Sequence, residues 1–229
     1  TRMTPVQAQA LPIALQGGDL IVQARTGSGK TAAFGIALLN RINQRDFGTQ
    51  TLILCPTREL ATQVATEIRR LARYLPNLKV VVLCGGQAFG PQVGSLEHGA
   101  HIVIGTPGRI RDHIEKQTLN LSRVNTLVLD EADRMLDMGF SEDIELIIDQ
   151  TLPTRQTLLF SATFPHDIES LSAKYQKGAR RVTIEEGHGA ASIAQHYYSC
   201  GAIETGDSRY AAVLRLLLHF KPESCLVFC

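Results

Sequence analysis

The sequence predicts a doubly wound α/β fold, in which helices cover both faces of a mostly parallel sheet. Short apolar runs alternate with stretches of helical periodicity along most of the 229 residues. Two of these runs, Thr51–Cys55 and Thr126–Asp130, are apolar on both faces, which is typical of central strands in a parallel sheet. Ligands of such sheets bind beyond the carboxyl ends of the strands, so functional segments are expected there.

Seven strands are expected along the chain. They are Asp19–Ala24, Thr51–Cys55, Lys79–Cys84, His101–Gly105, Thr126–Asp130, Thr157–Ser161 and Arg181–Glu185. Helical segments lie between them, and the clearest is Arg58–Leu75, whose apolar residues recur at the spacing of a helix face. These apolar residues are Leu60, Val64, Ile68, Leu71 and Leu75.

Composition and charge limit the class of protein. With 23 Lys and Arg against 22 Asp and Glu, the net charge of +1 gives no evidence for a polycation that coats nucleic acid. The five scattered cysteines form no Cys-x-x-Cys pair, so neither a zinc site nor a disulfide framework is indicated. No apolar run has the length of a membrane span, and the first residues lack a signal-peptide core. We expect a monomeric, cytoplasmic protein with no membrane contact, whose chain starts upstream of Thr1.

The character of the sequence changes after about Glu185. A stretch of small residues is followed by a predicted helix over Tyr210–Phe220 and a strand-like run at Cys225–Cys229. One helix and one strand cannot bury a core of their own, so they resemble the first elements of a second α/β domain. We therefore expect a domain over residues 1–186, a linker over 187–207 and the opening of a truncated domain over 208–229.

A phosphate-binding loop is predicted where the first strand ends. Gly27 and Gly29 allow a tight turn that aims backbone N–H groups at one point. Lys30 then reaches the outer phosphates of a nucleotide, the Thr31 hydroxyl can bind Mg²⁺, and the helix that begins here adds its N-terminal dipole. The general pattern has glycine at position 24, and Ala24 fits only with a negative φ.

Acidic residues follow the most apolar strand. Asp130 stands at the strand end, where a carboxylate can hold Mg²⁺ beside phosphates. Glu131 comes next and is placed to accept a proton from water that attacks the γ-phosphate. The alternative is that both residues only cap the following helix. A phosphate loop in the same sheet favours the catalytic interpretation, with Glu131 and Lys30 as catalytic residues.

Together these segments resemble the DEAD-box family of ATP-dependent RNA helicases, whose name is the tetrapeptide at Asp130–Asp133. The resemblance covers nearly the whole chain in the family's order, and the sequence is similar to bacterial members. The matching segments are Thr4–Gln7, Ala24–Thr31, Pro56–Leu60, Gly85–Gly86, Thr106–Arg109, Asp130–Asp133 and Ser161–Thr163. Members of the family usually carry alanine at position 24, so Ala24 agrees with the pattern.

The resemblance implies a RecA-like P-loop NTPase domain that binds ATP and Mg²⁺. Thr31 and Asp130 are implied as Mg²⁺ ligands, partly through water. Gln7 is expected to hydrogen-bond the adenine edge through its amide, and the alternative is a plain polar residue near a helix start. The residues implied in ATP binding are Thr4, Gln7, Ala24, Arg25, Thr26, Gly27, Ser28, Gly29, Lys30 and Thr31.

The resemblance also implies a surface that grips the sugar–phosphate backbone of RNA without reading bases. Its residues are Pro56, Thr57, Arg58, Gly85, Gly86, Thr106, Pro107, Gly108 and Arg109. Ordinary helix capping is the alternative for the two threonines, because each precedes a predicted helix. A further group is implied to couple the nucleotide state to RNA remodelling, and it consists of Asp133, Ser161 and Thr163.

The expected function is ATP-dependent unwinding or remodelling of RNA, and this chain carries the ATP-binding half. An arginine finger and the rest of the RNA site are expected on a second RecA-like domain of the same polypeptide. The main alternative is an ATP-gated RNA clamp or scaffold that does not unwind. A GTPase would need an Asn-Lys-x-Asp segment, which the sequence lacks, and a DNA translocase would accept deoxyribose.

Overall fold

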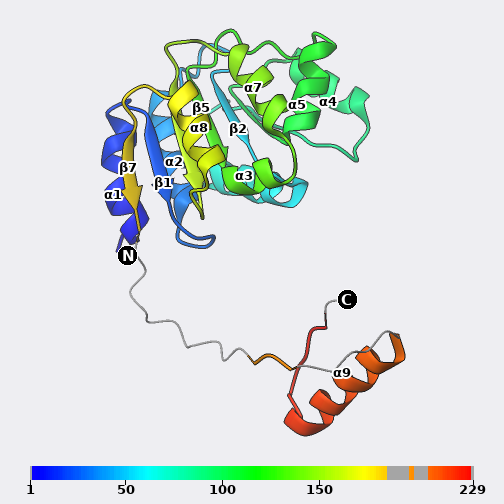
Figure 1. Cartoon of the computed structure of the whole chain (residues 1–229). Coiled ribbons are helices and arrows are strands. Elements are labelled where there is room, and N and C mark those ends of the chain that lie inside the picture. Colours follow the sequence, from blue (N-terminus) through cyan, green and yellow to red (C-terminus); the bar gives the residue numbers. More distant parts are fainter. Residues whose placement is uncertain (1, 185–195, 199–205, 228–229) are drawn as a thin grey trace. The chain divides into compact units, whose positions relative to one another are not determined.

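The computed structural model describes residues 2–184, 196–198 and 206–227 (Figure 1). The chain divides into two units, Thr1–Glu185 and Glu186–Cys229. Within the described ranges, no helix has both the length and the apolar character that a membrane crossing requires.

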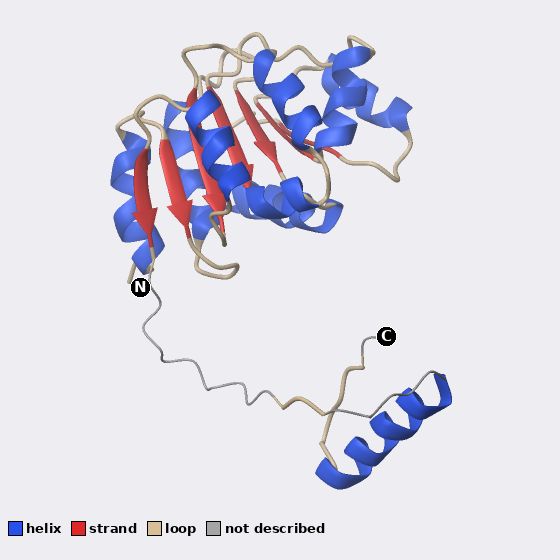
Figure 2. Ribbon diagram, viewed as in Figure 1, coloured by secondary structure: helices blue, strands red, loops and turns tan. Residues whose placement is uncertain are grey.

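The first unit contains one seven-stranded sheet in which every pair of neighbours is parallel (Figures 1 and 2). Across the sheet the strands follow the order β3-β4-β2-β5-β6-β1-β7. All seven predicted strands are confirmed, with small differences at their ends; Glu185 lies outside the described residues. The strands are β1 (Leu20–Gln23), β2 (Thr51–Leu54), β3 (Val80–Leu83), β4 (Ile102–Gly105), β5 (Thr126–Asp130), β6 (Gln156–Ser161) and β7 (Arg180–Thr183).

Helices cover both faces of this sheet, as the doubly wound prediction requires. One face carries α1 (Pro5–Leu15), α2 (Lys30–Arg41) and α3 (Arg58–Leu71). The other carries α5 (Pro107–Glu115), α6 (Ala132–Asp137), α7 (Ser141–Asp149) and α8 (His166–Tyr175), while α4 (Phe89–Glu97) follows the edge strand β3. The two helical layers cover two separate hydrophobic cores.

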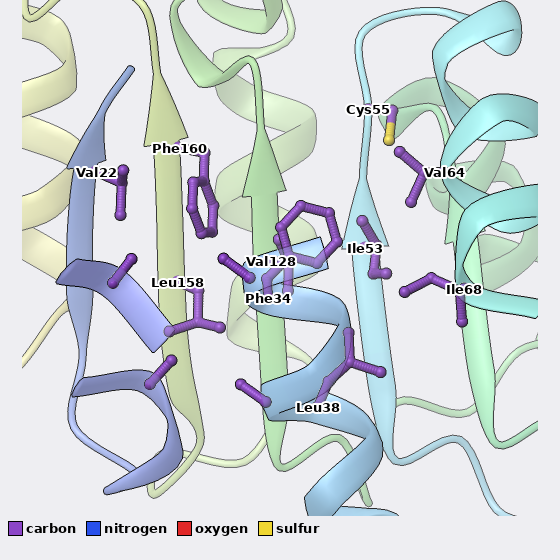
Figure 3. Close-up of a cluster of buried hydrophobic side chains, with 14 of the residues drawn as sticks. Val22, Phe34, Leu38, Ile53, Cys55, Val64, Ile68, Val128, Leu158 and Phe160 are labelled. Carbon is purple, nitrogen blue, oxygen red and sulfur yellow. The ribbon is translucent and has the colours of Figure 1, made fainter. Parts of the chain in front are cut away.

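Each inner strand contributes apolar side chains to both cores, because its side chains alternate between the two faces of the sheet. Successive side chains of a strand point to opposite faces, so Ile53 packs under α2 and α3 while its neighbours Leu52 and Leu54 pack on the other side. Figure 3 shows the core under α1, α2 and α3, which contains Phe34 and Phe160. The centroids of these two rings are 5.2 Å apart. Burial on both faces explains the consecutive apolar residues of the inner strands, whereas the edge strand β7 is buried only at Val182.

The helix predicted over Arg58–Leu75 is shorter than expected. It ends at Leu71, and Ala72 is its C-cap. Leu75 precedes Pro76, which disfavours helical backbone at the residue before it, and Asn77 has a positive φ of 60°. The apolar spacing therefore continued beyond the point where the backbone could stay helical.

The second unit contains α9 (Gly206–Phe220), which includes the predicted helix. The strand predicted at Cys225–Cys229 is not seen in its described part, because residues 225–227 have no strand conformation. A strand needs a hydrogen-bonded neighbour, and the described part of this unit offers none. The last two residues of that run, and most of the predicted linker over 187–207, lie outside the described residues. The three-part division of the chain stays a prediction.

Candidate functional site

The order of the strands gathers the candidate segments into two groups at the carboxyl ends of the sheet. The phosphate loop, the acidic tetrapeptide and Ser161–Thr163 follow β1, β5 and β6, which lie in adjacent places. Pro56–Leu60, Gly85–Gly86 and Thr106–Arg109 follow β2, β3 and β4, which form the neighbouring half. The pairing of β2 with β5 joins the two groups.

The phosphate loop has the backbone that its glycines predict. Gly27 and Gly29 have φ values of 83° and 92°, in the left-handed region that favours glycine. A β-carbon on Gly29 would also lie 2.7 Å from Nε2 of Gln7, so the Gln7 side chain would have to move to admit it. Ala24 has no positive φ, as its identity requires, and its N–H donates to the Ser161 carbonyl at 3.0 Å.

Lys30 lies inside this loop. Its side chain is buried, and Nζ donates to the Ala24 carbonyl at 3.0 Å. Ser28 closes the turn, because its hydroxyl donates to the Arg25 carbonyl at 2.8 Å. The ammonium group therefore sits at the point toward which the loop's backbone turns, where it can meet an anionic oxygen.

The loop and the acidic pair line one cavity, so the convergence that a nucleotide site requires is present. The cavity has a volume of 670 Å³, within the usual range for small-molecule sites. Its lining includes Gln7, Thr26, Gly27, Gly29, Lys30, Thr31, Asp130 and Glu131, with polar residues of α3 on the far wall.

Asp130 is suited to hold a cation. It is the last residue of β5 and is buried, and burial is the main cause that raises its pKa to about 6, against the opposing charge of Lys30. Its Oδ1 is buried without a hydrogen-bond partner. Thr31 lines the same cavity with a hydroxyl. Carboxylate and hydroxyl oxygens are ligands that Mg²⁺ prefers, so the donor set fits this ion.

Glu131 has a left-handed backbone, with φ 55° and ψ 52°, which is uncommon for a residue with a side chain. This turn directs its carboxylate to the phosphate loop, where Oε1 accepts a hydrogen bond from Thr26 Oγ1 at 2.8 Å. Although Glu131 occupies the N-cap position of α6, its side chain makes no capping hydrogen bond. Helix capping therefore does not account for this residue.

The third acid, Asp133, joins β6 to the acidic segment. Its Oδ2 accepts from the backbone N–H and the hydroxyl of Thr163, at 2.9 and 2.8 Å, and its N–H donates to Ser161 Oγ at 3.3 Å. Burial alone would raise the pKa of Asp133, but the hydrogen bonds from Thr163 and Ser161 outweigh it and lower that pKa. These three residues form one hydrogen-bonded group.

Gln7 contacts both the start of α1 and the phosphate loop. Its side chain accepts from the N–H of Thr4, whose hydroxyl accepts from the N–H of Gln7, and this reciprocal pair begins the helix. Its Nε2 donates to the Gly29 carbonyl at 3.2 Å. Gln7 is therefore part of the loop's support as well as a helix-start residue.

In the group that follows β2, β3 and β4, Thr57 and Thr106 differ in whether they cap a helix. Thr57 caps α3, because its hydroxyl accepts from the N–H of Leu60 at 3.3 Å, whereas Thr106 precedes α5 without a capping hydrogen bond. Gly85 and Gly86 are exposed, and a β-carbon on Gly86 would lie 3.5 Å from the Arg58 guanidinium. These segments therefore lie close together at one exposed edge, while Pro56 and Pro107 are buried beneath it.

Arg109 is directed toward protein groups. Its side chain is only 13% exposed, and Nη1 donates to the Gln87 carbonyl at 3.1 Å and to Gln92 Oε1 at 3.2 Å. The family resemblance assigned Arg109 to the predicted RNA contacts, which stays a prediction, and the sequence did not single out Gln92. No local signal marks this glutamine, because its partners lie in two other segments, the end of β3 and α5.

The geometry matches one known family. A model of DEAD/DEAH box helicases matches residues 4–171. This chain belongs to the DEAD/DEAH box helicase family. It is 52% identical over 227 residues to the ATP-dependent RNA helicase DbpA of Escherichia coli K12, covering 99% of this chain and 49% of that protein. It is 42% identical to the ATP-dependent RNA helicase CshA of Listeria monocytogenes, covering 98% of this chain and 42% of that protein.

Solved structures agree with this assignment. A DEAD box protein from Methanococcus jannaschii superposes with a TM-score of 0.76 at 43% identity, over 93% of this chain and 56% of that one. A hypothetical ATP-dependent RNA helicase from Sulfolobus tokodaii gives a TM-score of 0.73 at 38% identity, over 80% of this chain and 53% of that one. The sheet is thus the RecA-like domain of a DEAD-box protein, and the chain spans about half the length of the curated relatives it matches.

Proposed function

We propose that this chain is the ATP-binding half of an ATP-dependent RNA helicase. The observation that carries the proposal is the shared cavity of the phosphate loop and the acidic pair Asp130–Glu131. The exposed edge with Gly85–Gly86 and Arg58 lies over the neighbouring strands of the same sheet. Nucleotide and RNA would therefore bind side by side at one end of the sheet.

The proposed hydrolysis depends on positions and charges, because phosphoryl transfer needs little covalent help from protein. The loop's backbone N–H groups and Lys30 would hold the phosphates, and Gln7 would read adenine. Thr31 and Asp130 would hold Mg²⁺, which when bound neutralises charge on the phosphates. Glu131 would take the proton of the attacking water, with its carboxylate oriented by the Thr26 hydroxyl.

The proposed RNA contacts are to the sugar–phosphate backbone. Backbone amides at Gly85–Gly86 and at the openings of α3 and α5, with the half-exposed Arg58, supply this contact without base readout. The family resemblance supports a coupling role, between nucleotide state and RNA remodelling, for the group of Asp133, Ser161 and Thr163. Its hydrogen bonds tie the acidic segment to the end of β6.

We infer that a second RecA-like domain on the same polypeptide completes both sites. The twofold greater length of the curated relatives supports this inference. An arginine finger from that domain would stabilise charge on the transferring phosphate. A monomeric state and a cytoplasmic location also stay predictions.

The test compares stimulators and nucleotides in a two-domain polypeptide that contains this chain. We expect phosphate release from ATP to rise with single-stranded RNA and not with DNA of the same sequence, and GTP to compete poorly. Equal stimulation by DNA would favour a translocase instead. A strand-displacement assay on an RNA duplex then separates the helicase from the ATP-gated clamp, which would hold RNA without releasing a strand.

A further inference from the structure

A buried glutamine outside every recognised motif connects two segments of the proposed RNA edge. Gln92 lies in α4 and is 6% exposed. Its Nε2 donates to the Cys84 carbonyl at 3.0 Å. Its Oε1 accepts from Arg109 Nη1 at 3.2 Å and lies 3.0 Å from His113 Nε2. One amide thus links the end of β3 to two residues of α5.

The partners leave one orientation for this amide. A carbonyl oxygen can only accept and a guanidinium can only donate, so the amide nitrogen faces Cys84 and the amide oxygen faces Arg109. Because that oxygen cannot donate, His113 must carry its hydrogen on Nε2. The Gln92 amide therefore makes three hydrogen bonds. An apolar side chain at this position would remove all three, so each partner would lose its hydrogen bond to residue 92.

Arg109 holds the Gly85–Gly86 loop at a second point, beyond the bond from Gln92 to Cys84. Its Nη1, already bonded to Gln92, also donates to the Gln87 carbonyl at 3.1 Å. Cys84 and Gln87 stand on either side of Gly85 and Gly86, so the glycine pair is held at both ends. Glycine has the most conformational freedom to lose, and this loop therefore needs attachments from outside to keep one shape.

The bonds of Gln92 to Cys84 and His113 are buried, whereas the bond from Arg109 to Gln87 is exposed. His113 is fully buried, and the Phe89 ring stacks on it with centroids 4.2 Å apart and 16° between the planes. Lys116 Nζ lies 4.1 Å from the centre of the Phe89 ring. Hydrogen bonds in a site closed to water are strong, and each buried group that loses its partner is costly.

We propose that Gln92 is a positioning residue for RNA binding, which holds the Gly85–Gly86 loop in the shape that meets the sugar–phosphate backbone. It acts through Cys84 and Arg109 and does not touch RNA itself. The inference rests on the RNA-binding role proposed above for this loop. Pre-organisation of this kind strengthens binding because the loop is ordered before RNA arrives.

The test replaces Gln92 with methionine, which keeps the length of the side chain and removes the amide. A matched control is Gln156→Met, because Gln156 is also buried and its Nε2 also donates to backbone carbonyls, those of Ala14 and Gly18. Gln156 begins β6 and lies at the amino ends of the strands, away from the RNA edge. Gln92→Glu, which keeps the acceptor and loses the donor, is the milder variant if methionine prevents folding.

Three measurements on the whole chain separate positioning from general stability. The first is the affinity for a fluorescein-labelled oligouridine RNA by anisotropy, the second is the affinity for a fluorescent ATP analogue, and the third is hydrogen–deuterium exchange over residues 84–88. For Gln92→Met we expect roughly tenfold weaker RNA binding and faster exchange in the loop, with unchanged nucleotide affinity. Gln156→Met should change neither RNA affinity nor exchange over residues 84–88.

Unchanged exchange over residues 84–88 in Gln92→Met would overturn the inference, whatever happens to RNA binding. Faster exchange with parental RNA affinity would overturn it in a different way, since the loop would then be ordered by Gln92 but would not contact RNA. That second outcome would also remove Gly85–Gly86 from the proposed function, so the two failures are distinguishable. An equal loss of RNA and nucleotide affinity would show a general structural role and would likewise overturn it.

Discussion

Single residues at this site combine strain, burial and charge. Glu131 has a left-handed backbone, Asp130 is buried with an unpartnered oxygen, and the buried Lys30 donates to the Ala24 carbonyl of the phosphate loop. Each of these features is unfavourable or neutral for stability on its own. They share one cavity, and such a concentration at one place is typical of a functional site.

Glu131→Gln tests the proposed general base. The amide keeps the shape and can still bond to Thr26, but it cannot take a proton, so ATP turnover should fall by about 10²- to 10⁴-fold. ATP affinity should stay close to that of the parent protein. Phosphate release and nucleotide titration measure the two effects, with Glu142→Gln, an exposed residue of α7, as the control. Turnover at the parental rate would remove Glu131 from this role.

Because His113 is buried, we expect the folded protein to lose stability in mild acid. Burial is the main cause that lowers the pKa of His113, and the charge of Arg109 adds to the effect. The unfolded chain therefore binds a proton at His113 at higher pH than the folded chain does, with an unfolded pKa of about 6.5. The stabilising contribution is full above that pH and declines as the pH falls below it.

Urea unfolding at about pH 7.5 and about pH 5.5 measures this decline. His113→Gln should show a smaller loss of unfolding free energy between the two conditions than the parent, because the glutamine does not titrate. His98→Gln, at an exposed position, should keep the parental loss. An identical pH dependence in His113→Gln and in the parent would show that another group is responsible.

Among the elements, the junction of β4 with α5 is closely packed against β3 at the edge proposed to bind RNA. Gly105 ends β4, and Thr106 N–H donates to the Leu83 carbonyl at 3.1 Å, which brings β3 against the turn. A β-carbon on Gly105 would overlap that carbonyl oxygen and lie 2.9 Å from Ile110 Cδ1. The opening of α5 is thus set by contact with a neighbouring strand as well as by Pro107.

Gly105→Ala should therefore lower the unfolding free energy by about 1–3 kcal/mol, since backbone atoms must move to admit the methyl group. Gly94→Ala is the contrasting variant, because a β-carbon there meets nothing within 4 Å and the position is inside α4. That change should raise stability by up to about 1 kcal/mol through helix propensity. Chemical denaturation measures both, and equal effects from the two would contradict the packing described here.

At the scale of the whole molecule, the chain corresponds to about half the length of its curated relatives. The RecA-like unit contains the cavity proposed to bind nucleotide and the exposed edge proposed to bind RNA, while the described part of the second unit contains α9 and no strand. An arginine finger contributes about 10³–10⁵ in rate to related nucleotide hydrolases. Activity should therefore depend on a second domain far more than nucleotide binding does.

The 229-residue chain by itself should bind ATP weakly and hydrolyse it very slowly. Under saturating RNA, its turnover should be at least about 10³-fold below that of the two-domain polypeptide. Steady-state phosphate release from both proteins, prepared in the same buffer, makes the comparison. RNA-stimulated turnover by the short chain at a rate near that of the longer one would contradict the inferred need for a second domain.

The seven strands, their mostly parallel arrangement, the phosphate loop and the acidic pair could all be predicted from the amino-acid sequence. Hydrophobic period, glycine spacing and a carboxylate after an apolar strand are properties of contiguous residues, so they can be read without coordinates. The C-terminal end of α3 was misjudged because the apolar spacing continued past Leu71, although Pro76 gave a local signal against it.

The way in which these segments meet could be learned only from the three-dimensional structure. The strand order β3-β4-β2-β5-β6-β1-β7, the bond from Thr26 to Glu131 and the inward direction of Arg109 toward Gln92 all join residues far apart in the chain. Nothing in the local sequence specifies such pairs, because each depends on which strands become neighbours and on how closely they pack.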